Sequence, residues 1–336
     1  MPKTFPLATE AEWLALREDH IGGSDIACLF YRWLLPDGSE TVLHLFEIPP
    51  EGAQIIECIS TYKTGYRLWH EKAGLLKPNF ESNERMDAGR HMEPAMATWA
   101  QEKWPDMPIR KVRRYMSSST VAGMGASLDY EIWEKGRAGA PVEFKLVDWS
   151  VWRDQWVTAD GEIVMPPLSL TLQLQHQIAV AETDHGWMIA GVGGNKLVRG
   201  RVDRHRPTIA KIEEAVTVFW RAVAAGTPPA HVADYETVRM NHPDGNLGLV
   251  DLTGDIDLPT LAWKAKRLQR HIGRMEARLD LVKASISDRI GDHSKAVIAG
   301  YKISWPVIDI PEKVVPEKLQ PARHYRGALT ITEEKK

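Results

Sequence analysis

Alternating apolar and polar positions mark two strand-like segments in the middle of the chain. In Val142-Glu143-Phe144-Lys145, the two charged residues stand at i and i+2, so Glu143 and Lys145 share one face of a strand while Phe144 points to the opposite core. The earlier segment Gly125-Ala126-Ser127-Leu128-Asp129 places Asp129 on an adjoining strand. Two carboxylates and an ammonium are therefore expected in one pocket.

This combination of side chains is typical of a metal-dependent phosphodiesterase. Carboxylate oxygens are the ligands that Mg²⁺ and Mn²⁺ prefer. A lysine beside them can orient an attacking water or neutralise charge that builds on a phosphate. Taken alone, however, the same residues more often form a solvated strand face with a weak ion pair.

Apolar spacing along the rest of the chain predicts alternating helices and strands. Met92, Met96, Trp99 and Ala100 recur at three and four, and Glu93 interrupts their face, where a buried carboxylate would need a cation or a metal. The pattern predicts helices near 85–104, 149–157, 168–182 and 207–225, and strands near 109–116, 120–129, 140–147 and 185–202.

The predicted helix 168–182 carries three glutamines, which an ordinary core helix would not favour. Gln173 and Gln177 stand at i and i+4 and share one face of this helix. We therefore expect Gln173 to face the pocket and Gln175 to point elsewhere.

The composition of the chain changes after Asp234. His242-Pro243-Asp244-Gly245-Asn246 reads as a linker, and Ala296–Trp305 reads as a β-hairpin. Between them a heptad-like apolar stripe predicts one long helix: Leu261, Leu268, Ile272, Met275, Leu279, Val282 and Ile286. Three roles are open for such a helix: packing on its own domain, a coiled coil with another subunit, or an arm that guides DNA. The predicted organisation is a domain over 1–232, a linker over 233–258 and a helical and hairpin element over 259–336.

Length and cysteine content narrow the class of protein. A chain of 336 residues with 43% apolar content can form one large domain, or one domain with an appendage. Cys28 and Cys58 are too few for a disulfide framework or for an iron–sulfur cluster, which favours a reducing cytoplasm. The sequence has no run of eighteen apolar residues and no signal-peptide pattern, so neither a membrane span nor export is expected.

Several motifs in a fixed order resemble a known family. The order Glu93, Asp129, Glu143-x-Lys145, Gln173-x-Gln175 resembles the PD-(D/E)XK nuclease superfamily, and within it the YqaJ-like viral recombinase branch, the lambda exonuclease family. The resemblance extends over most of residues 12 to 231. It includes Trp13–Arg17, Ile21–Ala27, Tyr66–Gly74 and Phe219–Val223. Residues 31–62 interrupt the family's pattern and are interpreted as an insertion.

The resemblance implies a fold and a set of site residues. The fold is α/β (α+β), a PD-(D/E)XK restriction-endonuclease-like core with a mixed central sheet flanked by helices, here followed by the C-terminal long helix and hairpin. Asp129 and Glu143, helped by Glu93, would hold one or two Mg²⁺ ions, for which Mn²⁺ could substitute. Lys145 would position a water and Gln173 would orient the site. Arg17 and Ser24, seven positions apart, match the family's anchor for the 5′-phosphate of a DNA end.

The net charge of −3 conceals basic clusters that suit a nucleic-acid partner. One cluster lies at 110–114 and includes Arg113, and the other lies at 196–206 and includes Arg199 and Arg201. Either one alone could be a solvated edge that discourages aggregation. Next to a nuclease motif, contact with DNA phosphates is the better interpretation.

The function implied by the resemblance is a Mg²⁺-dependent exonuclease that resects double-stranded DNA ends, 5′ to 3′, for phage-type homologous recombination. It would act in the cytoplasm, that of a bacterial host if the chain is phage-encoded. Because members of the family are often ring-shaped oligomers that work with a single-strand annealing protein, a homo-oligomer and such a partner are expected. Two alternatives remain: a PD-(D/E)XK endonuclease for restriction or repair, and a non-catalytic scaffold that binds DNA ends.

Overall fold

The computed structural model describes residues 2–6, 9–78, 83–133, 139–229, 232–242, 248–298 and 301–306, without the side chains of Glu10 and Arg113. The chain divides into two compact units, Met1–Asn241 and His242–Lys336. The first unit contains every residue expected to form the site, and the second contains the C-terminal helix.

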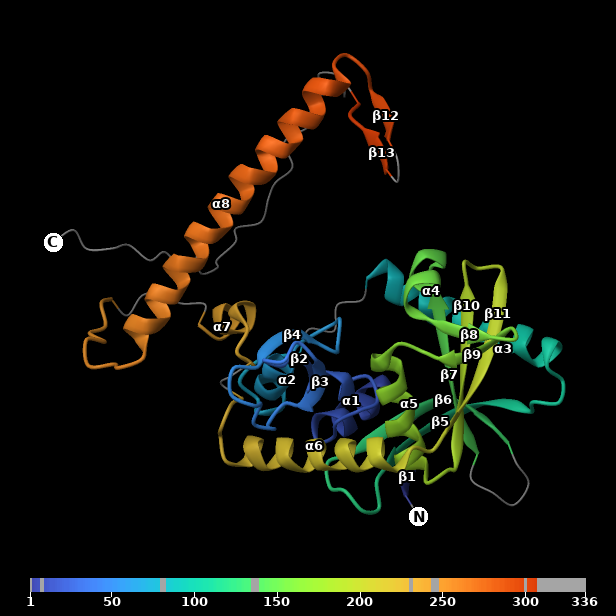
Figure 1. Cartoon of the computed structure of the whole chain (residues 1–336). Coiled ribbons are helices and arrows are strands. Elements are labelled where there is room, and N and C mark those ends of the chain that lie inside the picture. Colours follow the sequence, from blue (N-terminus) through green and yellow to red (C-terminus); the bar gives the residue numbers. More distant parts are fainter. Residues whose placement is uncertain are drawn as a thin grey trace, which may run out of the picture. The chain divides into compact units, whose positions relative to one another are not determined.

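A six-stranded mixed sheet forms the centre of the first unit (Figure 1). Its strand order is β1-β5-β6-β7-β10-β11, with β7 and β10 parallel and the other neighbours antiparallel. The strands span Lys3–Pro6, Ile109–Ser117, Gly125–Ile132, Ala140–Val147, His185–Val192 and Lys196–Asp203. The mixed central sheet predicted from the sequence is confirmed.

Helices cover both faces of this sheet. The described helices of the unit are α1 Glu10–Glu18, the short 3₁₀ helix η1 Ile26–Leu29, α2 Gly65–Lys72, α3 Glu84–Lys103, α4 Trp149–Gln155, α5 Leu168–Ala181, α6 Arg206–Ala224 and α7 Tyr235–Asn241. Phe144 of β7 packs with Met96 and Ala97 of α3 in one apolar cluster. Glu143, the next residue along β7, reaches α5 instead. Alternation along β7 therefore separates an apolar face under α3 from a polar face under α5.

The structure corrects two details of the sequence prediction. The strand expected over 120–129 begins at Gly125, because a turn precedes it in which the Ser118 hydroxyl accepts the N–H groups of Thr120 and Val121. The apolar face expected on α3 is also shifted. Met92 and Trp99 are exposed, and the buried side of the helix consists of Met96, Ala97 and Ala100. Glu93 therefore does not interrupt a buried stripe.

A small antiparallel sheet of order β3-β2-β4 lies in the segment 31–62, with its first strand beginning one residue earlier. Its strands are Phe30–Leu34, Glu40–His44 and Gln54–Cys58. A two-stranded hairpin, β8 Val157–Ala159 with β9 Glu162–Met165, follows α4 and was not predicted from the sequence.

The second unit contains the long helix and the hairpin that the sequence predicted. Helix α8 spans Leu258–Ile290, and β12 Lys295–Ile298 pairs antiparallel with β13 Tyr301–Ser304. The seven side chains of the heptad stripe are 39% to 63% exposed, so the described residues of this unit do not bury them. The linker residues 243–247 and the chain after 306 lie outside the described residues.

No helix in the described part of the chain is long and apolar enough to cross a membrane.

Candidate functional site

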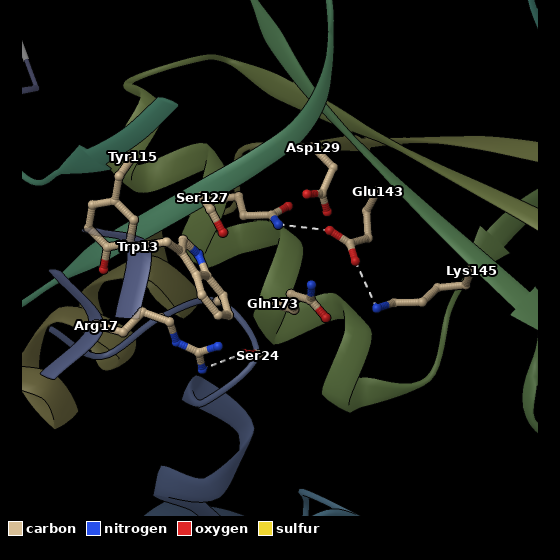
Figure 2. Close-up of a pocket in the computed structure, with 12 residues that line it drawn as sticks. Trp13, Arg17, Ser24, Tyr115, Ser127, Asp129, Glu143, Lys145 and Gln173 are labelled. Atoms are coloured by element: carbon tan, nitrogen blue, oxygen red, sulfur yellow. Dashed lines mark hydrogen bonds and ion pairs between the residues drawn. The ribbon is translucent and has the colours of Figure 1, made fainter. Parts of the chain in front are cut away.

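A cavity of about 240 Å³ opens where the N-terminal segment, strands β5 to β7 and helix α5 meet. Figure 2 shows Asp129, Glu143 and Lys145 on one side of it and Trp13, Arg17 and Tyr115 on the other. The lining residues are Trp13, Arg17, Gly22, Gly23, Ser24, Tyr115, Ser127, Asp129, Glu143, Lys145, Gln173 and Gln177. Most of the site residues predicted from the sequence are thus brought together.

The two carboxylates stand where strands β6 and β7 separate. The last paired residues at this end are Tyr130 and Val142. Asp129 and Glu143 come next on their strands, so they face the cavity just beyond the end of the ladder. Both carboxylates therefore line the cavity.

Glu143 is held by contacts from two directions. The Lys145 ammonium lies 2.7 Å from its Oε1, and Gln177 Nε2 donates a hydrogen bond of 2.8 Å to its Oε2. The carboxylate is 5% exposed, so these contacts compensate for most of its lost hydration. Burial by itself would lower the pKa of Lys145, but the adjacent Glu143 outweighs it and raises that pKa. Lys145 therefore carries its charge at neutral pH.

The surroundings of Asp129 disfavour its charged form, because burial and nearby acids outweigh the nearby lysines. Its pKa is raised to about 7, first because desolvation disfavours the charged form and then because Glu143 and Glu93 repel it. The side chain is nevertheless open to the cavity, so a cation can reach it. A site of adjacent carboxylates with one raised pKa, open to a polar cavity, fits a divalent cation.

Glu93 stands apart from this pair. It is half-buried on α3 and does not line the cavity, although its charge is felt at Asp129. In the described ranges, no three His, Cys, Asp or Glu side chains come close enough to hold one metal ion. The carboxylates that meet in the cavity are therefore Asp129 and Glu143. Mg²⁺ usually keeps several waters and binds through one or two carboxylates, so these two are sufficient.

Two backbone hydrogen bonds bring the N-terminal segment to the start of β6. Ile21 N–H donates to the Gly123 carbonyl at 2.8 Å, and Gly125 N–H donates to the Ile21 carbonyl at 3.1 Å. This bridge fixes the loop that carries Ser24 beside the strand that carries Asp129.

Arg17 and Ser24 contact each other on this side of the cavity. Arg17 Nη2 donates to Ser24 Oγ at 3.1 Å and to Asp25 Oδ2 at 3.0 Å, and its guanidinium lies 4.7 Å from the centre of the Trp13 ring. Asp25 is 2% exposed, and Lys63 Nζ lies 3.1 Å from its other oxygen. Burial would raise the pKa of Asp25, but Lys63, Arg17 and Lys72 together hold it well below its usual range. A permanently charged Asp25 therefore orients Arg17.

The helix α5 supplies two glutamines to the cavity. Gln173 lines it as predicted, and Gln175 turns away, donating to the Asp203 carbonyl and accepting from His205 N–H. The contact with Glu143 comes from Gln177, which the sequence analysis did not assign to the site. The sequence did carry a signal for this residue, because Gln177 follows Gln173 by four positions and so shares its face of the helix. Gly23 of the N-terminal loop lies next to both side chains, since a Cβ there would be 3.4 Å from Gln173 Cγ and 3.5 Å from Gln177 Cγ.

The other predicted DNA-binding residues do not line the cavity. Arg199 stacks over Trp104 and Trp187, with its guanidinium carbon 5.0 and 5.5 Å from the ring centres. Arg201 pairs with Asp203 at 2.8 Å. The side chain of Arg113 lies outside the described residues. Both arginines on β11 thus have partners within the chain, which leaves Arg17 as the arginine that lines the cavity.

Two arginines of the first basic cluster bind a buried acid. Arg110 Nε and Arg114 Nη2 each lie 2.5 Å from a carboxylate oxygen of Glu131, which is 0% exposed. The charge of this cluster is therefore used largely to stabilise β5 against β6.

Asp129→Asn is expected to stabilise the metal-free protein at alkaline pH. A carboxyl whose folded pKa is raised from 3.8 to about 7 destabilises the folded state above pH 7, and this cost disappears as pH falls toward 3.8. Asparagine carries no charge, so we expect a gain of about 1–2 kcal/mol at pH 8, reduced by solvent screening, and almost none at pH 4. Urea unfolding in EDTA at both pH values measures it. Asp154→Asn, at an exposed acid, should show no such gain, and an equal gain for Asp129→Asn at both pH values would contradict the prediction.

Comparison with known proteins finds one family model that matches part of the chain. The model of the YqaJ-like viral recombinase domain matches residues 51–184. Two solved structures of an alkaline exonuclease, LHK-Exo from Laribacter hongkongensis, are similar to this chain at 17% identity. Each similarity covers 64% of this chain and 93% of the other, with TM-scores of 0.45 for the first structure and 0.46 for its complex with dAMP. No curated protein matches the chain significantly. The family match includes Asp129, Glu143, Lys145 and both cavity glutamines, whereas Arg17 and Ser24 precede it.

Proposed function

We propose that this chain is a metal-dependent nuclease that resects double-stranded DNA ends in phage-type recombination, from 5′ to 3′. The match of the YqaJ-like viral recombinase model to residues 51–184 supports this proposal. One observation carries the proposal. Asp129, Glu143 and Lys145 share a single cavity with Arg17 and Ser24. The first three residues suit phosphodiester hydrolysis, and the other two suit a terminal phosphate.

Each side chain has a part in this chemistry. Asp129 and Glu143 would hold Mg²⁺ or Mn²⁺, which when bound makes water more acidic and neutralises charge on the phosphate. Lys145 would orient the attacking water or stabilise the developing charge, since it stays protonated beside Glu143. Gln173 and Gln177 would fix the orientation of this side of the site. Arg17 and Ser24 would hold the 5′-phosphate of the strand being cut, which sets the polarity.

End-labelled linear duplex DNA tests the function directly. We expect Mg²⁺-dependent release of nucleotides from 5′ ends and no cutting of covalently closed circles. Internal nicking of the circles would instead identify an endonuclease. Binding of DNA ends with no cleavage in Mg²⁺ or Mn²⁺ would identify a non-catalytic scaffold and would refute the proposal.

Arg17→Ala is expected to remove the preference for a 5′-phosphate. A hydrogen bond to a charged group contributes about 1.5–3 kcal/mol, so the ratio of initial rates on 5′-phosphate and 5′-hydroxyl ends should fall by about tenfold or more. Arg201→Ala, on β11, serves as the comparison, and its ratio should remain that of the wild type. Equal rates on both kinds of end with the wild-type protein would show that no phosphate anchor exists.

A further inference from the structure

We infer that the Tyr115 hydroxyl is an additional donor to the terminal phosphate, beside Arg17 and Ser24; this inference rests on the proposed function. Tyr115 lies on β5 and lines the cavity. It was not among the residues singled out from the sequence. Its side chain is 1% exposed, so its position is fixed by packing.

The hydroxyl of Tyr115 finds no hydrogen-bond partner among the described residues, although it is buried. An unpaired buried hydroxyl costs free energy, because the group has lost its water without a replacement. The backbone polar groups of the adjacent Gly125 are already paired. Gly125 N–H donates to Ile21, and the Gly125 carbonyl accepts from His176 Nε2 at 2.8 Å. A phenylalanine would fill the same space without this cost, so the oxygen is better explained by a ligand than by the fold.

The space around the hydroxyl depends on a glycine. A Cβ on Gly125 would lie 2.4 Å from Tyr115 Oη, so the absence of a side chain at this position is what admits the hydroxyl. The His20 ring packs against the tyrosine ring from another side, with 5.4 Å between the ring centres. Both neighbours fix the direction in which the phenol points.

The charges near the hydroxyl suit an anion. Tyr115 lies within electrostatic reach of Arg17 and Asp25, and Arg17 is the cation that contacts Ser24. Burial raises the pKa of Tyr115, so the hydroxyl keeps its proton and can donate it in a hydrogen bond. A phosphate held by Arg17 would therefore meet a neutral donor rather than a second negative charge.

Binding requires a local rearrangement. Arg17 and Ser24 now bond each other, and neighbouring atoms cover the Tyr115 oxygen. A phosphate that accepts hydrogen bonds from both Arg17 and Ser24 would replace the single hydrogen bond that joins them. The cost of separating them is offset by three hydrogen bonds to the anion.

Tyr115→Phe in the full chain tests this assignment, because it removes a single oxygen and keeps the ring. We expect the ratio of initial rates on 5′-phosphate and 5′-hydroxyl duplex ends to fall by about tenfold or more, mainly through a higher KM for phosphorylated ends. The midpoint of urea unfolding should stay the same or rise, since an unpaired buried oxygen has been removed.

Tyr31→Phe is the matched control. The Tyr31 hydroxyl is also buried, but it accepts a hydrogen bond of 2.9 Å from Gly65 N–H. Its removal leaves that N–H unpaired, so this variant should lower the unfolding midpoint and keep the wild-type rate ratio. A wild-type ratio in Tyr115→Phe, or a loss of stability in it like that of Tyr31→Phe, overturns the inference. A wild-type protein that does not distinguish the two ends overturns the phosphate anchor itself, and this inference with it.

Discussion

Lys145→Met is expected to reduce DNA cleavage by about a hundredfold or more while the protein remains folded. The ammonium lies 2.7 Å from Glu143 Oε1 in the cavity and is the cation positioned to orient a water or to stabilise charge on the scissile phosphate. Stabilisation of that kind contributes several kcal/mol to the transition state, and each 1.36 kcal/mol is a factor of ten in rate. Methionine keeps most of the aliphatic length, so the lost rate reports the charge.

Single-turnover cleavage of linear duplex DNA in Mg²⁺ measures this effect, and circular dichroism confirms the fold. Asp129→Ala and Glu143→Ala should show losses of the same order, because each removes a carboxylate that would hold the cation. Lys211→Met, at an exposed lysine on α6, is the control and should cleave at the wild-type rate. A Lys145→Met variant that cleaves at nearly the wild-type rate with unchanged dependence on metal would show that the role assigned to Lys145 is wrong.

Glu131→Ala is expected to lower the free energy of unfolding by about 3 kcal/mol at pH 7. Glu131 is fully buried on β6, two residues beyond Asp129, and Arg110 and Arg114 both bind it. Removal of the acid leaves two guanidinium groups without their partner. The loss falls at the low end for a broken buried pair, because Arg110 and Arg114 are 51% and 30% exposed and can regain some water.

Urea unfolding measures this change in stability. Glu57→Ala removes one of the two acids that pair with Arg32 on the exposed side of the small sheet and should have little effect, since such pairs contribute little. Equal losses for the two variants would mean that Glu131 contributes no more than a surface acid.

Pairs of site residues that lie on the same strand or helix were predictable, because their relative placement depends on the geometry of that one element. Glu143 and Lys145 share a face because side chains alternate along a strand, and both line the cavity. Gln173 and Gln177 share a face because four residues make about one helical turn, and both line it as well. The long helix α8 also followed from the spacing of apolar residues, whereas the mixed sheet followed from the family resemblance.

Contacts between elements were not predictable in the same way. The basic residues at 110–114 correctly indicated a charged strand. They did not indicate that Glu131 on the neighbouring strand binds two of them. That pairing depends on the register of β5 against β6, which shifts between Lys111 and Arg114. Glu93 was expected with the metal-binding acids, yet it does not line the cavity and acts on Asp129 only through its charge.

The amino-acid pattern was enough to predict the order of the elements and the shared face of Glu143 and Lys145. Through family resemblance it also indicated the residues expected to hold a metal and a phosphate. Three features came from the three-dimensional packing instead: Gln177 contacts Glu143, Asp25 orients Arg17, and the Tyr115 hydroxyl beside Gly125 has no partner among the described residues. The two groups of features differ in how far apart along the chain the interacting residues lie. Periodicity encodes which side of a helix or strand a residue occupies, whereas hydrogen bonds between distant segments depend on how those segments pack, and that packing is settled by the whole core at once.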